Sequence, residues 1–225
     1  MKILIFDGSP KEKSDTIRLT DAFIEGLNEK KDNTIVKYKV INNDIKPCLG
    51  CFSCWNNNGK CIIKDDMEKI LKDMLQSDII IWSFPLYYFG LPSHLKALLD
   101  RTLALTKKSI VEVDGCFYHS FKDDIKDFKT IMICGSGFPY YKENFEAVIK
   151  QFQNSFHKDL TTITVSQTPM LNVKEANVVT DFLLKKFISA GREYYQTKKL
   201  SKETIEKLQK PMFPKDLYLK MANNQ

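Results

Sequence analysis

The chain has 225 residues, a formal net charge of +6 and 43% hydrophobic residues, which suits one hydrophobic core and a single domain. No run of about 18 apolar residues occurs, so we expect no membrane span. The basic residues are scattered rather than gathered in one stripe, which argues against nucleic acid as a partner.

The first stretch, MKILIFDGSPKEKSDT, predicts a strand, an anion-binding loop and a helix over Thr16–Glu29. Free N–H groups and the helix dipole both favour an anion at such a helix N-terminus. Neither G-x-x-x-x-G-K-[ST] nor G-x-G-x-x-G is present, which excludes an ATP-type P-loop and the dinucleotide fingerprint. The loop hydroxyls instead suit a phosphate monoester: Ser9, Ser14 and Thr16. The chain enters this strand without a leader pattern, so we expect a cytoplasmic protein.

Strands and helices alternate along the rest of the chain. We expect strands over residues 34–40, 78–83, 130–134 and 161–165, and helices over 91–105, 144–156 and 174–195. A further helix begins near Asp65-Asp66, where Asp65 with Glu68 resembles a capping box. Residues 106–127 are too long for an ordinary connection, and Val113-Asp114-Gly115-Cys116 predicts a β-hairpin there.

Five strands separated by helices predict a doubly wound parallel sheet of order 2-1-3-4-5, with the hairpin inserted before the fourth strand. Ligands of such sheets bind at the carboxyl ends of the strands, beside strand 1. That rule selects three loops, residues 8–15, 84–90 and 135–141. We expect residues 1–200 to form the domain and residues 201–225 to be an extension that packs on it or on a partner subunit.

The second of these loops is rich in aromatic residues. Pro85 stiffens its backbone, and Tyr87, Tyr88 and Phe89 offer flat apolar surface. Next to a phosphate loop, this composition fits a planar aromatic ligand with a phosphate tail. Packing of the same rings between helices is the alternative.

These motifs resemble a known family. Gly8-Ser9-Pro10 with Thr16, and Ser83–Gly90 running into Leu95–Arg101, resemble the flavodoxin-like NAD(P)H-dependent FMN reductases. The segment Pro47–Cys54, followed by Gly59-Lys60-Cys61 and Asp65-Asp66-Met67, is similar to the branch containing the iron–sulfur flavoproteins and their cluster-free relatives. Cys134-Gly135 before Gly137-Phe138-Pro139 resembles the third flavin loop of that branch.

The resemblance implies FMN, NAD(P)H as cosubstrate, and two-electron transfer to a small acceptor such as a quinone or a flavin. The implied FMN site has three parts: Ser9, Lys11, Ser14 and Thr16 at the phosphate; Pro85, Leu86, Tyr87, Tyr88 and Phe89 along the ribityl chain and ring edge; and Gly135, Ser136 and Gly137 facing the ring. Lys11 stands where arginine is frequent and Asp15 where asparagine is frequent. No catalytic side chain is implied, because the flavin carries the chemistry. His94, His119 and His157 are expected at the surface or in helix packing, although Tyr118 and His119 of the hairpin are candidates to close over the flavin.

Four of the six cysteines are clustered, which in a cytosolic chain indicates metal or redox chemistry rather than a disulfide framework: Cys48, Cys51, Cys54 and Cys61. Their spacing can wrap a [4Fe–4S] cluster. Zinc is less natural, since structural zinc sites usually pair two separated C-x2-C knuckles. Trp55 and the run Asn56-Asn57-Asn58 resemble the cluster-free relatives. The metal-free interpretation is favoured over the cluster, so no metal ligand is assigned.

The leading hypothesis is therefore an FMN-dependent oxidoreductase. An electron carrier between protein partners and a flavin-binding redox regulator are its alternatives. The basic charge and the extra segments favour the enzyme over a small flavodoxin carrier, which tends to be acidic. We also expect a homodimer or homotetramer, because the aromatic loop, hairpin and tail offer more apolar surface than one domain needs.

Overall fold

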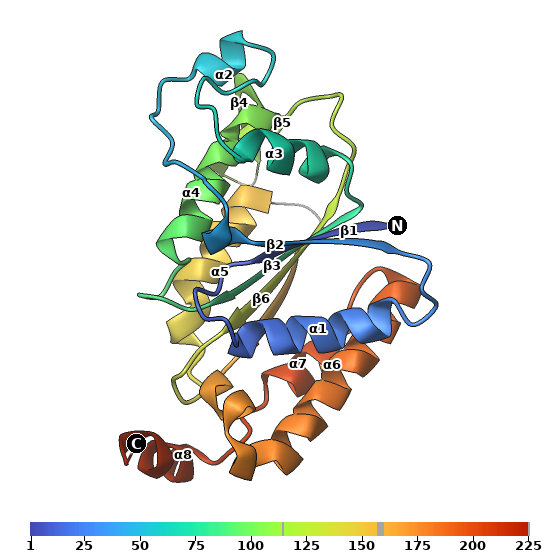
Figure 1. Ribbon diagram of the computed structural model, residues 1–225, viewed down its shortest axis with the longest axis vertical. Helices are drawn as coiled ribbons and strands as arrows, with labels where there is room; N and C mark the ends of the chain where they lie inside the picture. Colours follow the sequence, from blue (N-terminus) through green and yellow to red (C-terminus); the bar gives the residue numbers. More distant parts are fainter. Residues whose placement is uncertain (114, 157–159, 225) are drawn as a thin grey trace.

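The computed structural model describes residues 1–113, 115–156 and 160–224 (Figure 1). A five-stranded parallel sheet of order β2-β1-β3-β6-β7 lies at its centre. Its strands are β1 (Lys2–Asp7), β2 (Thr34–Lys39), β3 (Ile79–Pro85), β6 (Lys129–Gly135) and β7 (Leu160–Val165). Because β6 and β7 are the fourth and fifth strands of this sheet, the predicted order 2-1-3-4-5 is confirmed.

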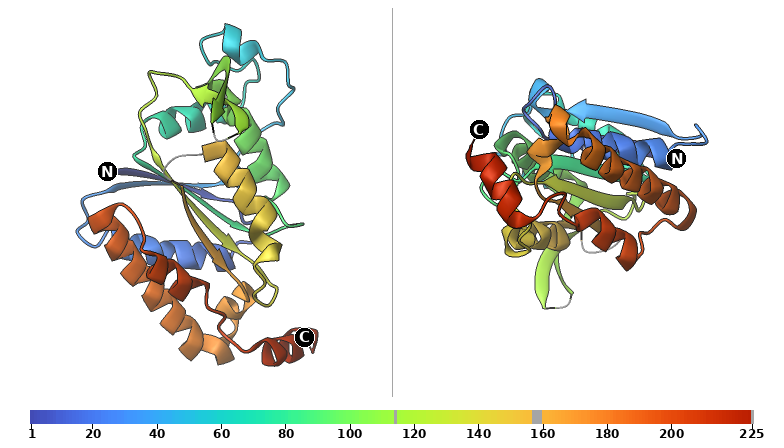
Figure 2. Two further views of the ribbon diagram at one scale, coloured as in Figure 1. Left: turned by 180° about the vertical axis from the view of Figure 1, so that it is seen from behind. Right: turned by 90° about the horizontal axis from the view of Figure 1, so that it is seen from below.

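The inner strands are apolar on both faces because helices cover both faces (Figures 1 and 2). In β1, Leu4 and Phe6 belong to one buried cluster, and Ile3 and Ile5 belong to another. The first cluster is completed by α3 (Met67–Leu75), α4 (Ser93–Arg101) and α5 (Glu143–Phe156). The second is completed by α1 (Asp15–Leu27), α6 (Asn177–Thr197) and α7 (Lys202–Gln209).

Helices α1 and α6 pack unusually closely. A Cβ on Gly26 would lie 1.9 Å from the carbonyl oxygen of Ile188, and a Cβ on Gly191 would lie 2.0 Å from that of Phe23. Larger residues would force the two helices apart. This contact fixes α1, whose N-terminus carries the first candidate loop.

The segment between α4 and β6 contains the predicted hairpin. Its strands β4 (Thr106–Val113) and β5 (Cys116–Phe121) pair antiparallel, whereas Asp114 lies outside the described residues. The hairpin and the short helix α2 (Ser53–Asn56) lie together at the top of Figure 1, at the other end of the molecule from the C-terminus. The Trp55 indole donates to the Thr106 hydroxyl at 3.3 Å and joins the two segments.

The predicted capping box is wrong. Helix α3 begins at Met67, and the Asp65 carboxylate accepts the Met67 N–H two residues on, at 3.1 Å. Glu68 pairs instead with Lys72, one turn along, at 3.2 Å. The Asp65 carboxylate also forms a buried ion pair with Arg101 of α4.

Two predicted helices end differently from expectation. The segment predicted over residues 91–105 is α4 followed by the 3-10 turn η2 (Thr102–Leu105). The long closing helix is α6, which is preceded by two 3-10 turns, η3 (Thr168–Asn172) and η4 (Lys174–Ala176). The earlier 3-10 turn η1 (Val40–Asn42) follows β2.

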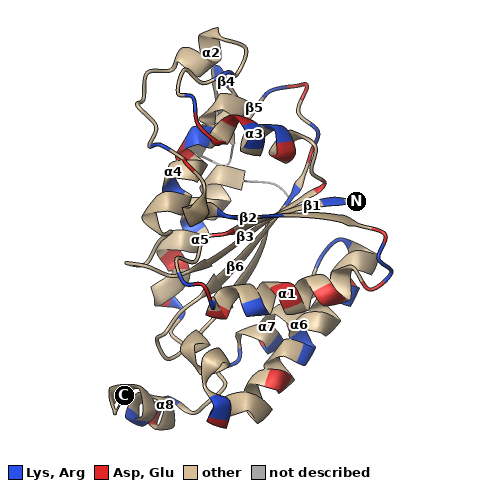
Figure 3. Ribbon diagram, viewed as in Figure 1, with Lys and Arg blue, Asp and Glu red and all other residues tan. Residues whose placement is uncertain are grey.

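The C-terminal extension packs on the same chain. In α7, Leu208 is fully buried in the cluster beneath the sheet. The last helix, α8 (Lys215–Asn223), places Tyr218 against Met170 and Ala176. Basic and acidic residues are interspersed along the helices (Figure 3). Among the described residues, no helix has the length and apolar character needed to cross a membrane.

Candidate functional site

The first loop joins β1 to α1 and presents unpaired hydrogen-bond donors. Ser14 caps α1, since its hydroxyl oxygen accepts the Ile17 N–H at 3.1 Å. Ser9, Ser14 and Thr16 are all at least 96% buried, and their hydroxyl hydrogens have no acceptor in the described part of the chain. The backbone N–H groups of residues 12–16 likewise have no acceptor there. These donors at a helix N-terminus fit a phosphate group.

Lys11 and Asp15 form an ion pair within this loop. The Lys11 ammonium lies 3.4 Å from the Asp15 carboxylate, and the Asn172 amide donates to the other oxygen of that carboxylate. Asn172 belongs to η3, which follows β7, and its amide also lies 3.5 Å from the Lys13 carbonyl. Asp15 therefore ties the first loop to the far edge of the sheet. Because Lys11 is paired with Asp15, hydrogen bonds rather than the Lys11 charge are the main attraction that this loop offers an anion.

Neighbouring side chains fix the start of the same loop. Asp7, at the end of β1, accepts the Ser9 N–H at 3.0 Å. Burial raises the pKa of the Asp7 carboxyl, although this hydrogen bond opposes the rise. His94 Nε2 lies 3.0 Å from the Gly8 carbonyl oxygen, and because a carbonyl only accepts, Nε2 carries the hydrogen. Burial lowers the pKa of the His94 imidazole, which favours this neutral donor.

The second loop ends in a tight turn that displays aromatic rings. Tyr87 and Gly90 exchange backbone hydrogen bonds at 3.1 and 2.9 Å, so Tyr88 and Phe89 occupy the central positions. Both have positive φ, 46° and 61°, which is the type I′ geometry that favours Gly or Asn. The Tyr88 side chain is fully exposed, and Tyr87 and Phe89 are about half exposed. Two aromatic residues thus adopt a strained backbone conformation with their rings exposed, an arrangement that indicates a binding role.

The third loop follows β6 and contacts the other two. The Leu86 N–H donates to the Gly135 carbonyl at 2.7 Å, and the Phe89 and Phe138 rings stack with centroids 6.2 Å apart. A Cβ on Gly135 would lie 2.6 Å from the Thr16 hydroxyl oxygen, so only glycine fits beneath α1. The three predicted loops therefore meet at one edge of the sheet. They combine an anion-binding helix end with exposed aromatic surface.

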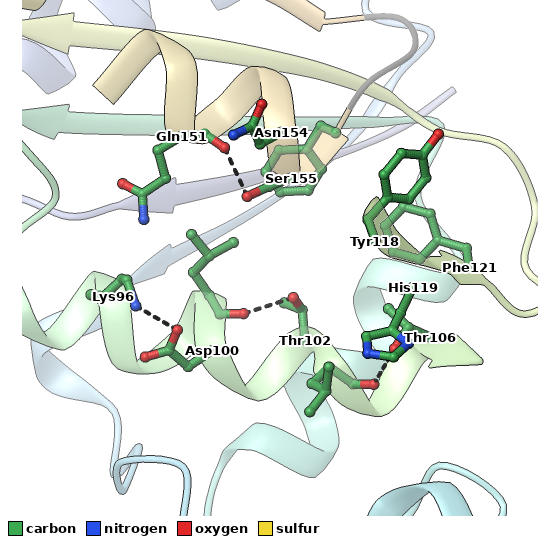
Figure 4. Close-up of a pocket in the computed structure, with 13 residues that line it drawn as sticks. Lys96, Asp100, Thr102, Thr106, Tyr118, His119, Phe121, Gln151, Asn154 and Ser155 are labelled. Carbon is green, nitrogen blue, oxygen red and sulfur yellow. Dashed lines mark hydrogen bonds and ion pairs between the residues drawn. The ribbon is translucent and has the colours of Figure 1, made fainter. Parts of the chain in front are cut away.

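The hairpin does not lie over these loops in this chain. The His119 ring packs on Trp55 with centroids 4.7 Å apart, and Tyr118 and His119 line a cavity of about 330 Å³ between α4, the hairpin and α5 (Figure 4). Two of the polar groups around that cavity are engaged within the chain: Lys96 binds Asp100 at 2.6 Å, and the Ser155 hydroxyl donates to the Gln151 backbone carbonyl. We therefore place the candidate site at the strand ends. His157 lies outside the described residues.

The cysteine segment forms a projection beside the hairpin. Cys48 and Cys51 are exposed, and Cys54 and Cys61 are half-buried. Hydrogen bonds from Ser53 lower the pKa of the Cys51 thiol, whereas burial raises that of Cys54. Within residues 1–113, 115–156 and 160–224, no group of three or more His, Cys, Asp or Glu side chains is arranged to hold a metal ion.

Comparison with known proteins agrees with this architecture. The family described as "flavodoxin-like fold" matches residues 1–198. The chain belongs to that family. An iron-sulfur flavoprotein of Methanocaldococcus jannaschii is 34% identical to it over 105 residues, which are 47% of this chain and 53% of that protein. The chain thus matches about half the length of this curated relative.

Two solved structures share the fold over most of the chain. An FMN-dependent NADH-azoreductase from Bacillus anthracis, solved in complex with FMN, has a TM-score of 0.63 at 19% identity and covers 86% of this chain and 99% of its own. An NAD(P)H:quinone oxidoreductase from Methanothermobacter marburgensis has a TM-score of 0.60 at 18% identity, covering 85% and 94%. At such identities the likeness concerns the fold.

Sequence reasoning missed the segment after β7. Residues 166–172 contact the first loop through Asn172 and the third loop through Thr168, whose N–H donates to the Ser136 carbonyl at 2.9 Å. The Ser166 hydroxyl is buried and has no partner in the described part of the chain. The available signal was position alone, since this segment also follows the carboxyl end of a strand. His94 was missed as well, because its contact with Gly8 spans 86 residues.

Proposed function

We propose that the chain is an FMN-dependent oxidoreductase that transfers hydride from NAD(P)H to a small acceptor such as a quinone or a flavin. The observation that carries the proposal is the meeting of the donor-rich α1 N-terminus with the strained aromatic turn at one sheet edge. FMN combines a phosphate with a flat ring system and would satisfy both. The names of the iron-sulfur flavoprotein and of the two FMN- or quinone-linked neighbours support the same cofactor class.

In this proposal, Ser9, Ser14 and Thr16 donate to the phosphate together with the N–H groups of residues 12–16. Lys11 keeps the Asp15 charge balanced from the exposed side of the loop. Without that pairing, the carboxylate would repel a bound phosphate.

The other two loops would hold the rest of the cofactor. Residues 85–89 would flank the ribityl chain and the ring edge, and residues 135–137 would face the ring. When bound, FMN would accept a hydride from the nicotinamide and pass two electrons to the acceptor. Backbone N–H groups of the third loop suit the negative charge that develops on the ring.

A reconstitution assay tests the proposal. Purified chain incubated with FMN and freed of excess cofactor should retain a yellow flavin spectrum. It should then oxidise NADH or NADPH in the presence of a simple quinone with no protein partner. Protein that retains no FMN would overturn the proposal at the cofactor level. Protein that retains FMN but oxidises neither nicotinamide would overturn the enzyme and leave the carrier.

The alternative is an electron carrier between protein partners. It is favoured by one observation, the exposure of Cys48 and Cys51 in a clustered cysteine segment, and by the name of the iron-sulfur flavoprotein relative. Nicotinamide turnover in the reconstitution assay separates the carrier from the enzyme, and anaerobic purification with iron and sulfide analysis decides whether the cysteine segment holds a cluster. Flavin bands alone would dismiss a cluster, whereas an added broad shoulder with about four irons per chain would establish a [4Fe–4S] group on this segment.

We also propose a cytoplasmic homodimer or homotetramer. The support is the exposed aromatic surface at the sheet edge, where Tyr88, Phe89, Phe138 and Tyr141 are all about half exposed or more. Light scattering coupled to gel filtration would give the mass, and a monomer at micromolar concentration would contradict this assembly.

A further inference from the structure

The C-terminal helix α8 reaches the candidate site although it lies beyond the family match, which ends at residue 198. The Tyr218 hydroxyl donates to the carbonyl oxygen of Gly137 in the third loop. Tyr218 is 2% exposed and packs against Met170 and Ala176. In both Figure 1 and the left view of Figure 2, α8 lies beside the loop that follows β6.

A second contact anchors the tail at the same place. The fully buried Gln167 side chain donates to the Phe213 carbonyl and accepts the Phe213 N–H, both at 2.9 Å. The Gln167 N–H in turn donates to the Phe138 carbonyl at 3.1 Å. The backbone of Gln167 has φ 60°, a left-handed conformation that residues other than Gly and Asn rarely adopt. The strained backbone is therefore held by two-point pairing with the tail.

These contacts restrain the third loop from two sides. Its Ser136 and Phe138 groups bond to the segment after β7, whereas the Gly137 carbonyl bonds to the tail. The Gly137 N–H has no acceptor in the described part of the chain, so it is a donor left over for a ligand. The Gly137 N–H and the Gly137 carbonyl belong to successive peptide groups that are joined at the Gly137 Cα, and the Ser136 carbonyl of the first group accepts the Thr168 N–H. Because glycine restricts rotation about its Cα least, the Tyr218 contact on the second group restrains a joint that the residue itself leaves free.

We propose that Tyr218 is a positioning residue of the flavin site: by holding the Gly137 carbonyl it fixes the rotation about the Gly137 Cα, and with it the third-loop backbone on one side of the free Gly137 N–H. The inference rests on the proposed FMN function. Burial and the nearby Asp15 charge raise the pKa of the Tyr218 hydroxyl, which keeps it protonated and able to donate. The tail thereby adds to the third loop a restraint that comes from outside the family-matched part of the chain.

The test compares Tyr218→Phe with Tyr195→Phe in the full chain. Tyr195 is a matched control, because its hydroxyl also makes a hydrogen bond, to Asp32 at 2.6 Å, and it lies at the end of α6. We expect Y218F to weaken FMN binding about three- to ten-fold, the effect of one ordinary hydrogen bond, and Y195F to leave it unchanged. We also expect Y218F to make the midpoint potential of bound FMN more negative, since a less restrained third loop holds its N–H donors less firmly against the reduced ring. A purely structural role would not move this potential.

Amide hydrogen exchange on the cofactor-free proteins gives an independent readout. Peptides covering residues 136–141 should exchange faster in Y218F than in wild type or Y195F, with unchanged exchange in the central strands. Equal FMN affinity, equal potential and equal exchange in the two variants would overturn the positioning role. If wild type binds no FMN, the proposed function falls, and the exchange data alone then decide whether Tyr218 holds the loop.

Discussion

Arg101 and Asp65 form a two-pronged ion pair in which both side chains are almost fully buried. The two N–O distances are 2.8 and 3.1 Å, and the side chains are 2% and 0% exposed. Arg101 also donates to the Lys46 carbonyl at 2.8 Å, and the Asp65 carboxylate accepts the Lys46 N–H at 3.0 Å. The pair therefore joins α4 to both ends of the cysteine segment, just before Cys48 and just after Cys61.

Removing the cation of this pair should be costly. Arg101→Met leaves the Asp65 carboxylate buried without its partner, and we expect a loss of about 3–5 kcal/mol in the free energy of unfolding. Lys96→Met is the matched control on the same helix, because it breaks the half-exposed Lys96–Asp100 pair. The control should cost less than about 1 kcal/mol. Urea unfolding measures the stability of both variants, and equal losses of unfolding free energy would contradict the structural role of the Arg101–Asp65 pair.

The same pair predicts a pH dependence. Burial alone would raise the pKa of the Asp65 carboxyl, but hydrogen bonds from Arg101, Lys46 and Met67 outweigh it and lower that pKa. A carboxyl with a lowered folded-state pKa stabilises the fold above its unfolded value, which is about 3.9, and loses this contribution as the pH falls through the folded value. The stability gap between wild type and Asp65→Asn should therefore be constant near neutral pH and shrink in acid. Urea midpoints measured from pH 7 to pH 3 check this. A gap that widens in acid would refute it.

Ser14 should contribute to both helix stability and phosphate binding. Ser14→Ala removes the cap of α1 and one phosphate donor, so we expect a loss of about 1 kcal/mol in stability and a clear loss of FMN affinity. Ser201→Ala is the control, because Ser201 caps α7 in the same way, accepting the Thr204 N–H at 3.2 Å. It should lose similar stability and no affinity. Thermal unfolding and FMN fluorescence titration separate the two effects, and equal affinities in both variants would remove Ser14 from the site.

We expect Tyr88 to contribute to FMN binding while slightly lowering the stability of the fold. Its positive φ is strained, and its side chain is fully exposed, so Tyr88→Gly should leave stability unchanged or raise it by up to about 1 kcal/mol. The lost ring should weaken FMN binding if residues 85–89 line the cofactor. Lys31→Gly relieves a comparable positive φ in the turn after α1 and should leave FMN binding unchanged. A Tyr88→Gly variant that loses stability but keeps full affinity would contradict this role.

The sequence by itself determined the sheet and the position of the three candidate loops along the chain. The continuous apolar run Ile79-Ile80-Ile81-Trp82 requires cover on both faces, and strand–helix alternation then gives the doubly wound order. Each candidate loop follows a strand directly, so local pattern was enough to locate it. The exposed aromatic turn over Tyr87–Phe89 likewise depends on neighbours within a few residues.

Only the tertiary structure decided which groups in those loops are free and which are engaged. The local sequence around Asp65 fits a capping box, yet its carboxylate forms an ion pair with Arg101, 36 residues away. Asp15 is held by Asn172 across 157 residues, and Gly137 by Tyr218 across 81. Such partners leave no periodic or local signal, because a hydrogen bond between distant segments depends on how helices and sheet pack rather than on sequence spacing. The candidate loops are thus encoded locally, whereas the contacts that hold them in place are long-range.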